Sequence, residues 1–167
     1  MESAKLHKNM LTGLVVTSRI THATPAAFSA HVAWRDWEND IALQQIGENP
    51  LGRTVDLMFG GGRCQFITNK TEGGCRLDDR NLIEEAKSKY GWNTILDSRK
   101  QFDALADDAQ LPLMGLYTPD VSMIREIDFC KLCDVSSWIT DPEFVLLYST
   151  CHIALTEIPR SNLRWRR

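Results

Sequence analysis

Three polar side chains after the first apolar segment have the types and spacing of an anion-binding group. His22 and Thr24 follow the apolar run 14–16, and Arg35 stands eleven residues beyond Thr24. A guanidinium suits phosphate because it presents parallel donors to two oxygens and does not lose its charge. Taken without its context, an arginine beside an acidic residue such as Asp36 is instead read as a solvated surface charge.

The elements expected around these residues place them at one edge of a sheet. The run 14–16 is rich in β-branched residues, as in a strand covered on both faces. Thr24 precedes Pro25, where a helix N-cap hydroxyl is expected, so we predict a helix over 26–33 with Arg35 about three turns along it. Because open α/β sheets bind ligands at the carboxyl ends of parallel strands, a ligand site is expected there.

The rest of the first 120 residues alternates between predicted helices and strands. Apolar spacing, glycines and turn residues define these segments, and Gly13 is expected to end the first helix. Such alternation implies right-handed crossovers and a mostly parallel sheet, so we interpret residues 1–120 as an α/β domain. The expected helices cover residues 2–10, 37–46, 77–90 and 98–105, and the further strands cover residues 54–59, 93–96 and 111–117.

Composition and charge set limits on the function. The chain has 167 residues, of which 43% are hydrophobic and 25% charged, as in an ordinary globular domain. A formal net charge of −3 argues against nucleic-acid binding as the main role, since that role leaves a basic footprint. No apolar run approaches the ~20 residues that span a bilayer, and residues 1–9 are too polar for a signal peptide. We therefore expect no membrane segment and no targeting signal in this chain.

Three segments together resemble the alkaline phosphatase family. They are His-Ala-Thr-Pro-Ala-Ala-Phe-Ser-Ala-His-Val-Ala-Trp-Arg at 22–35, Asp-Leu-Met-Phe-Gly-Gly-Gly-Arg at 56–63 and Leu-Met-Gly-Leu-Tyr at 113–117, in the order of the family. The resemblance covers roughly residues 2–120. It implies a fragment of a mostly parallel central sheet flanked by helices, from a metal-dependent phosphomonoester hydrolase that forms homodimers.

The resemblance also implies a role for each polar residue of the first segment. Arg35 matches the arginine that grips the substrate phosphate, and Thr24 matches a hydroxyl ligand of magnesium. His22 stands where members of the family carry aspartate or histidine, and it would act on magnesium through water. The alternatives remain a helix N-cap for Thr24 and an ordinary hydrogen-bonded polar residue for His22. His31 is assigned to structure.

Other parts of the family's catalytic machinery are not found in this sequence. The family uses a serine nucleophile and two zinc ions, and neither the serine segment nor the zinc-binding Asp and His clusters are present. We therefore expect the isolated chain to be an inactive, truncated fragment. One alternative is a non-catalytic phosphate-binding or regulatory protein. Residues 121–167 are expected to be an unrelated or frame-altered tail, in which a second alternative places a zinc-binding module at Cys130, Cys133, Cys151 and His152.

A loop rich in glycine and threonine bears on the compartment. Cys64 and Cys75 flank it, and a disulfide between them would close it, whereas two reduced cysteines in a cytosolic loop are the alternative. Asn69 begins an Asn-Lys-Thr glycosylation triplet inside the loop. Family members work in secreted, periplasmic or vacuolar compartments, so we expect a secretory or vacuolar lumen. The preceding glycines 60–62 lack the Lys-Ser/Thr of a phosphate loop and are interpreted as a structural turn.

Overall fold

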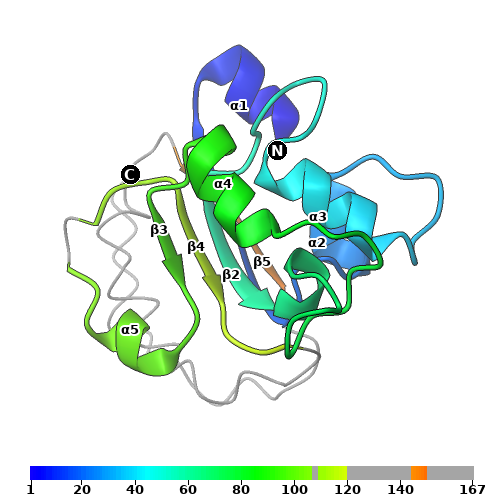
Figure 1. The fold of residues 1–167 in the computed structure, drawn as a ribbon. Helices are drawn as coiled ribbons and strands as arrows, with labels where there is room; N and C mark the ends of the chain where they lie inside the picture. Colours follow the sequence, from blue (N-terminus) through cyan, green and yellow to red (C-terminus); the bar gives the residue numbers. More distant parts are fainter. Residues whose placement is uncertain (107–108, 120–143, 150–167) are drawn as a thin grey trace.

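Five parallel strands form the centre of the structure, a computed structural model that describes residues 1–106, 109–119 and 144–149 (Figure 1). The strand order is β3-β4-β2-β1-β5, and each neighbouring pair is parallel. This confirms the predicted α/β class and parallel sheet. The strands are β1 (Leu11–Arg19), β2 (Leu57–Gly61), β3 (Thr94–Leu96), β4 (Leu113–Leu116) and β5 (Phe144–Ser149).

Helices cover the sheet and supply its two apolar layers. The alternation of side chains along β1 sends Leu14 and Val16 into one layer and Val15 into the other. The first layer includes buried residues of α3 and α4, and the second includes Phe102 of α5. The helices are α1 (Glu2–Lys8), α2 (Ala23–Ser29), α3 (Glu38–Ile46), α4 (Leu82–Tyr90) and α5 (Arg99–Asp103), with a 3-10 turn η1 at Arg63–Phe66.

Two predicted boundaries in the first half of the chain are wrong. The first helix ends at Lys8 and not at residue 10, and Gly13 does not end it, because Asn9 adopts a left-handed conformation with φ of 52° and closes α1 there. Gly13 instead lies inside β1, paired with Leu57 of β2. The helix expected from residue 77 begins only at Leu82, where the Asn81 side chain accepts the backbone N–H groups of residues 83 and 84.

The sheet also includes a strand from the segment expected to be an unrelated tail. Residues 144–149 form β5, which pairs in parallel with β1 from Leu11 to Val16. The division of the chain at residue 120 stays a prediction, since residues 120–143 and 150–167 lie outside the described part. Within the described residues, every helix is too short or too polar to cross a membrane.

Candidate functional site

The turn after β1 carries His22 and stands at the carboxyl edge of the sheet. The N–H of Ile20 donates to the carbonyl of Gly61 at 3.1 Å, which keeps the turn beside the end of β2. The N–H of His22 then donates to the carbonyl of Arg19 at 3.0 Å and reverses the chain into α2. The predicted location of His22 at the end of the first strand is therefore confirmed.

The predicted N-cap role of Thr24 is wrong. The helix begins one residue earlier than Thr24, because the carbonyl of His22 accepts the N–H of Ala26 at 2.9 Å. His22 occupies the cap position with extended backbone and makes no side-chain cap bond. Thr24 lies exposed in the first turn of α2, so its hydroxyl is not committed to capping the helix. Pro25 fits the third helical position because the first N–H groups of a helix have no intrahelical acceptor.

Arg35 does not lie on that helix, contrary to the prediction. The helix α2 ends at Ser29, and Ala30 is extended. The Gln44 side chain of α3 accepts the N–H of His31 at 2.7 Å and donates to its carbonyl at 2.9 Å, which holds the chain open at this point. Arg35 therefore stands on the connection between α2 and α3. The ring of His31 contacts Glu2 of α1 at 2.8 Å, in keeping with a structural role.

Arg35 and His22 nevertheless meet. The Nη2 atom of Arg35 lies 3.3 Å from Nε2 of His22, although the two residues stand thirteen positions apart. The Arg35 side chain is 62% exposed, and its contact with the Asp36 carboxylate, at 3.8 Å, is too long for a hydrogen bond. The other six arginines in the described ranges have a carboxylate oxygen at 3.3 Å or less (Arg19, Arg53, Arg63, Arg76, Arg80 and Arg99). Among the arginines that the structure describes, Arg35 is thus the one whose guanidinium is best placed to receive an external anion.

Two side chains of α3 hold the turn that carries His22, and the sequence analysis missed both. The Glu38 carboxylate accepts Nε and Nη2 of Arg19 at 2.9 and 2.8 Å and the hydroxyl of buried Thr21 at 2.5 Å. The Gln45 amide donates to the carbonyl of Ile20 at 2.8 Å and to the Ser29 hydroxyl at 3.0 Å. Gln45 could have been found from the sequence, as a polar residue on the apolar face of the predicted helix. Glu38 gave no signal, because its partners are seventeen and nineteen residues away.

The glycines after β2 have a packing role. A Cβ atom at Gly60 would stand 3.0 Å from Cγ2 of Val16, and one at Gly62 would stand 2.9 Å from Cβ of Arg19. The φ angle of Gly62 is 82°, a region that favours glycine. The glycines therefore let the ends of β1 and β2 approach closely, as the interpretation of a structural turn expects.

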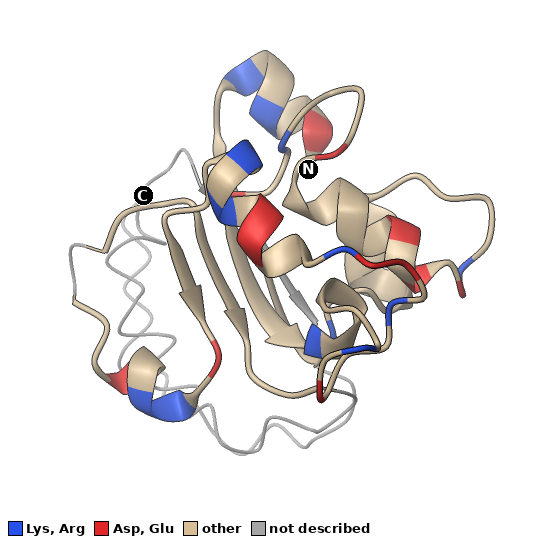
Figure 2. Cartoon of the chain, in the orientation of Figure 1, with Lys and Arg blue, Asp and Glu red and all other residues tan. Residues whose placement is uncertain are grey.

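The carboxylates whose pKa values are clearly lowered lie outside the candidate site. Asp56 stands before β2, at the opposite edge of the sheet, and accepts Lys5 Nζ and Arg53 Nη1, each at 2.7 Å. Burial by itself raises its pKa, but the hydrogen bonds from Lys5, from the Thr12 backbone and from Arg53 together lower it below the ordinary value. Figure 2 shows that strands β2, β3 and β4 carry no charged residue, so such ion pairs gather on the helices and connections around them.

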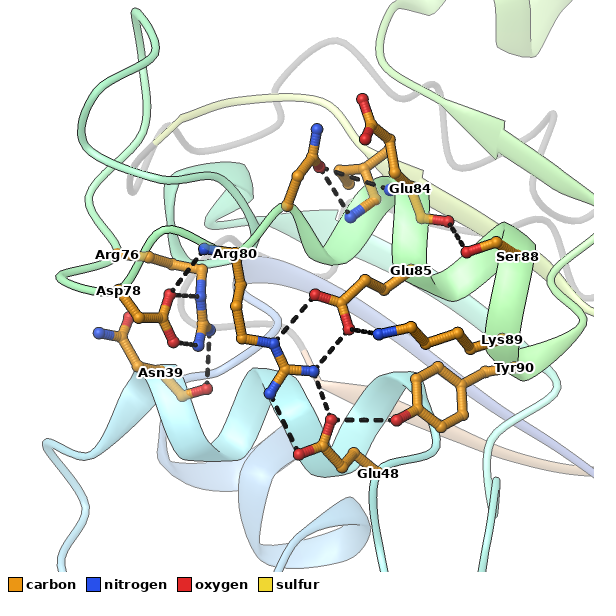
Figure 3. A network of polar contacts seen from close by, with 12 residues as sticks. Asn39, Glu48, Arg76, Asp78, Arg80, Glu84, Glu85, Ser88, Lys89 and Tyr90 are labelled. Atoms are coloured by element: carbon orange, nitrogen blue, oxygen red, sulfur yellow. Dashed lines mark hydrogen bonds and ion pairs between the residues drawn. The ribbon is translucent and has the colours of Figure 1, made fainter.

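A second polar network joins α3, α4 and the segment between them (Figure 3). Arg76 is buried, donates to Asp78 through Nε and Nη2, and donates through Nη1 to the carbonyls of Asn39 and Gln65 at 2.9 Å each. Arg80 binds Glu48 and Glu85, and its hydrogen bonds lower the pKa of Glu85 to about 2. These contacts hold helices together, so the shifted pKa values indicate structure here and not catalysis.

The described residues do not fit a complete magnesium or zinc site. Magnesium prefers several oxygen ligands, and of the predicted site residues only Thr24 offers one. No group of three or more His, Cys, Asp or Glu side chains that could hold a metal occurs among the described residues. The predicted zinc-binding residues Cys130, Cys133, Cys151 and His152 lie outside the described part of the chain.

The loop after η1 is closed by a disulfide. Cys64 and Cys75 are joined, with 4.9 Å between their Cα atoms. Asn69 lies exposed within the loop, and its N–H donates to the carbonyl of Arg76 at 2.9 Å. The structure therefore has the cysteine pair in its oxidised form, with the predicted acceptor asparagine at the surface.

The comparisons with known proteins agree on one family. A family model described as alkaline phosphatase matches residues 1–134, which passes the predicted division at 120. The alkaline phosphatase of Schizosaccharomyces pombe is 48% identical over 129 residues, covering 77% of this chain and 24% of that protein. The repressible alkaline phosphatase of Saccharomyces cerevisiae is 48% identical over 138 residues, with the same two coverages. The chain thus spans about a quarter of the length of these relatives.

Solved structures agree on the fold. Alkaline phosphatase from the Antarctic bacterium TAB5 matches with a TM-score of 0.65 at 22% identity, covering 90% of this chain and 42% of that one. A variant of the TAB5 enzyme with a histidine replaced by aspartate, and magnesium bound in its M3 site, matches with a TM-score of 0.66 at 23% identity, covering 90% and 41%. At this identity the solved structures support the architecture alone, and they say nothing about the residues of the candidate site.

Proposed function

We propose, on the premise that this chain belongs to the alkaline phosphatase family, that it forms the phosphate-gripping part of a metal-dependent phosphomonoesterase. The family acts as a phosphoric monoester hydrolase, and the chain has the family's fold. The observation that carries the proposal is the state of Arg35, which is exposed, held beside His22 and without a carboxylate at hydrogen-bond distance.

Arg35 would bind the phosphoryl group of a phosphomonoester or free phosphate. Its guanidinium has five donors in one plane, and its contact with His22 uses one of its nitrogens. Two parallel donors can still face a pair of phosphate oxygens. Because both Arg35 and Asp36 are mostly exposed, their mutual attraction is weak and an incoming dianion would compete with it readily.

Thr24 is proposed as one oxygen donor to a magnesium ion, with His22 acting on that ion through water. The exposed hydroxyl of Thr24 supports this, since it is not used as a helix cap. For His22, the support is the resemblance, which places this residue where members of the family carry aspartate or histidine. These two residues do not form a magnesium site by themselves, so we derive no catalytic step from them.

The isolated chain is proposed to lack turnover. Hydrolysis through a phosphorylated serine needs that serine and the metal ions beside it, and the described residues contain no cluster that fits them. The whole protein would act on phosphomonoesters in a secretory or vacuolar lumen and form the family's homodimer. A non-catalytic phosphate-binding or regulatory role is the second candidate, favoured by the same exposed Arg35.

The test is phosphate binding to the purified chain, measured by calorimetry and by phosphorus NMR. We compare the wild type with Arg35→Ala, Arg35→Lys and a matched control, Arg99→Ala, which removes a partly exposed arginine of α5. Binding lost in Arg35→Ala, weakened in Arg35→Lys and kept in Arg99→Ala supports the proposal. Equal affinity in all four proteins refutes it. Affinity in the micromolar range favours the regulatory candidate over a fragment of an enzyme.

A second assay separates binding from turnover. The same proteins are incubated with a chromogenic phosphomonoester at alkaline pH in the presence of zinc and magnesium. We expect no hydrolysis above the Arg35→Ala background. Turnover that Arg35→Ala abolishes would mean that the chain contains a substitute nucleophile and that the proposed inactivity is wrong.

A further inference from the structure

We propose that Trp34 and Trp37 form an aromatic subsite beside Arg35, which favours phosphomonoesters whose ester oxygen is bonded to an aromatic ring. The subsite rests on the proposed function, because Arg35 has to hold the phosphoryl group before the two indoles can contact the rest of the ester. The substrate class is thus the aryl phosphates, and the two tryptophans distinguish them from alkyl phosphates.

The first observation is where the exposed aromatic side chains lie. Among the residues whose side chains the structure describes, three aromatic residues are exposed, and all of them lie within residues 28–37 (Phe28, Trp34 and Trp37). Figure 1 shows that the connection between α2 and α3, which carries both tryptophans, extends away from the sheet. Large aromatic side chains that gather in water at one place mark a surface that binds a ligand or a partner.

The second observation is a tight turn that brings both tryptophans close to the guanidinium. The N–H of Trp37 donates to the carbonyl of Trp34 at 3.1 Å, so residues 34–37 form a four-residue turn with Arg35 and Asp36 at its tip. In such a turn the first and last Cα atoms lie within about 7 Å of each other. The far end of the turn is anchored, because the carbonyl of Trp37 accepts the first backbone hydrogen bonds of α3.

The third observation is a carboxylate that connects the Trp34 ring with Arg35. Nε1 of Trp34 donates to Oδ2 of Asp36 at 3.0 Å, while Oδ1 of the same carboxylate lies 3.8 Å from Nε of Arg35. The Asp36 carboxylate thus holds one edge of the indole near the guanidinium. Because the indole engages this carboxylate, the donors of Arg35 remain accessible to an external anion.

The chemistry of an aryl phosphate matches this arrangement. Its ring is bonded directly to the ester oxygen, so a phosphoryl group on Arg35 brings the ring within reach of the turn. An aryl ring and an indole attract each other in stacked or edge-to-face contacts, and both leave water when they meet. A small alkyl ester has no ring to offer, and a nucleotide carries its base several bonds farther from phosphorus. We therefore expect an aryl ester to bind about three- to tenfold more tightly than an alkyl ester.

The experiment measures the binding of three anions to the purified full chain at alkaline pH, by calorimetry. The anions are inorganic phosphate, ethylphosphonate and benzylphosphonate. In each phosphonate a CH₂ group replaces the ester oxygen, so that the bond to phosphorus cannot be hydrolysed. Benzylphosphonate stands for an aryl phosphate and ethylphosphonate for an alkyl phosphate. Proton NMR of the benzyl ring adds a direct readout, since stacking on an indole shifts its ring protons upfield.

The variants separate the two indoles from other effects on the site. They are Trp34→Ala, Trp37→Ala, Trp34→Phe, which keeps an aromatic ring, and a matched control, Phe28→Ala, which removes an exposed aromatic ring outside the turn. Circular dichroism checks that each variant is folded. The readout is the ratio of the two phosphonate affinities within each protein, because a general change at Arg35 alters both affinities alike.

We expect the wild type and Phe28→Ala to share the preference for benzylphosphonate and the upfield shift. Trp34→Ala and Trp37→Ala should each bring the ratio closer to one, with a much smaller effect on phosphate, and Trp34→Phe should keep part of the preference. A wild-type ratio of one, or a preference that survives in both alanine variants, overturns the subsite even where phosphate binding depends on Arg35.

Two further outcomes point elsewhere. A wild type that binds none of the three anions overturns the proposed function and the subsite with it. A ratio of one, together with self-association that sedimentation velocity detects and that Trp34→Ala or Trp37→Ala abolishes, would assign the turn to a protein interface and would also overturn the subsite.

Discussion

Replacing Arg76 by methionine should destabilise the protein far more than the same replacement of Arg80. Both arginines belong to the network between α3 and α4, and Arg80 forms ion pairs with two carboxylates, whereas Arg76 pairs with one (Figure 3). Counting ion pairs would therefore rank Arg80 first. Burial reverses that order, since the Arg76 side chain is 1% exposed and that of Arg80 is 31% exposed.

The magnitude follows from the partners that each substitution leaves behind. Methionine keeps much of the aliphatic packing of Arg76 but leaves the carbonyls of Asn39 and Gln65 without their donor. Hydrogen bonds to charged groups contribute about 1.5–3 kcal/mol each, so losing these two should lower the free energy of unfolding by about 3–6 kcal/mol. Glu48 and Glu85 can be hydrated again after Arg80→Met, and exposed pairs contribute about 0.2–1 kcal/mol each. That variant should therefore lose about 1 kcal/mol.

The assay is urea unfolding of the oxidised proteins, followed by circular dichroism and tryptophan fluorescence. The two probes should give coincident transitions, which allows the free energies to be compared. Arg76→Met should move the midpoint to much lower urea, and Arg80→Met should move it slightly. An equal loss in the two variants, or a larger one in Arg80→Met, would refute the argument that burial decides the order.

Three further predictions concern stability. Asp56→Asn should lower the free energy of unfolding by about 2–3 kcal/mol at neutral pH. Because folding lowers the pKa of Asp56, the stabilisation by this carboxylate is present above the unfolded pKa of about 3.9 and is lost as the pH falls through the folded value. The free energy of unfolding, measured from about pH 2 to pH 7, should therefore depend less on pH in the variant than in the wild type. The double variant Cys64→Ser/Cys75→Ser should lose about 3 kcal/mol of its free energy of unfolding in urea, because the disulfide closes a loop in the unfolded chain. A wild type that loses less than this on reduction would contradict the prediction. Gly62→Ala should lower the free energy of unfolding by about 2–4 kcal/mol, and Gly52→Ala by about 1 kcal/mol. Both glycines have positive φ, but only at Gly62 would the added Cβ have neighbours within 4 Å. Equal losses in the two variants would refute the argument from the close approach of Gly62 to Arg19.

The sheet could be predicted from the sequence because its signals are local. The β-branched run of β1, the apolar residues of β2 and β4 and the glycine after α4 each fix one element, and the structure confirms a strand or helix at each place. The helix α5 also begins as expected, with the Ser98 side chain accepting the N–H of Gln101. Periodicity and capping act over a few residues, so they are visible in a single sequence.

The course of the chain around Arg35 could not be predicted, because contacts distant in sequence decide it. The segment after Ser29 has no glycine and no proline to stop a helix, so a helix through 33 was the natural expectation. The Gln44 side chain supplies the missing reason by binding both backbone groups of His31. In the same way, α4 begins later than predicted because the residues before it form other contacts: Arg76 donates to Asp78, and Arg80 donates to Glu85.

The arginines differ in whether they hold the fold, and this difference connects the fold with the proposed function. Arg19, Arg76 and Arg80 are held by carboxylates that fix helices and turns, so their donors are already used. The chain of contacts runs from Arg76 to the backbone of Asn39 in the first turn of α3, and from the adjacent Glu38 to Arg19 and Thr21, directly before His22. Other residues therefore hold the turn that carries His22, and Arg35 takes no part in these contacts. The exposed guanidinium of Arg35, held beside an imidazole at the carboxyl edge of a parallel sheet, therefore supports the proposal that this residue binds an anion.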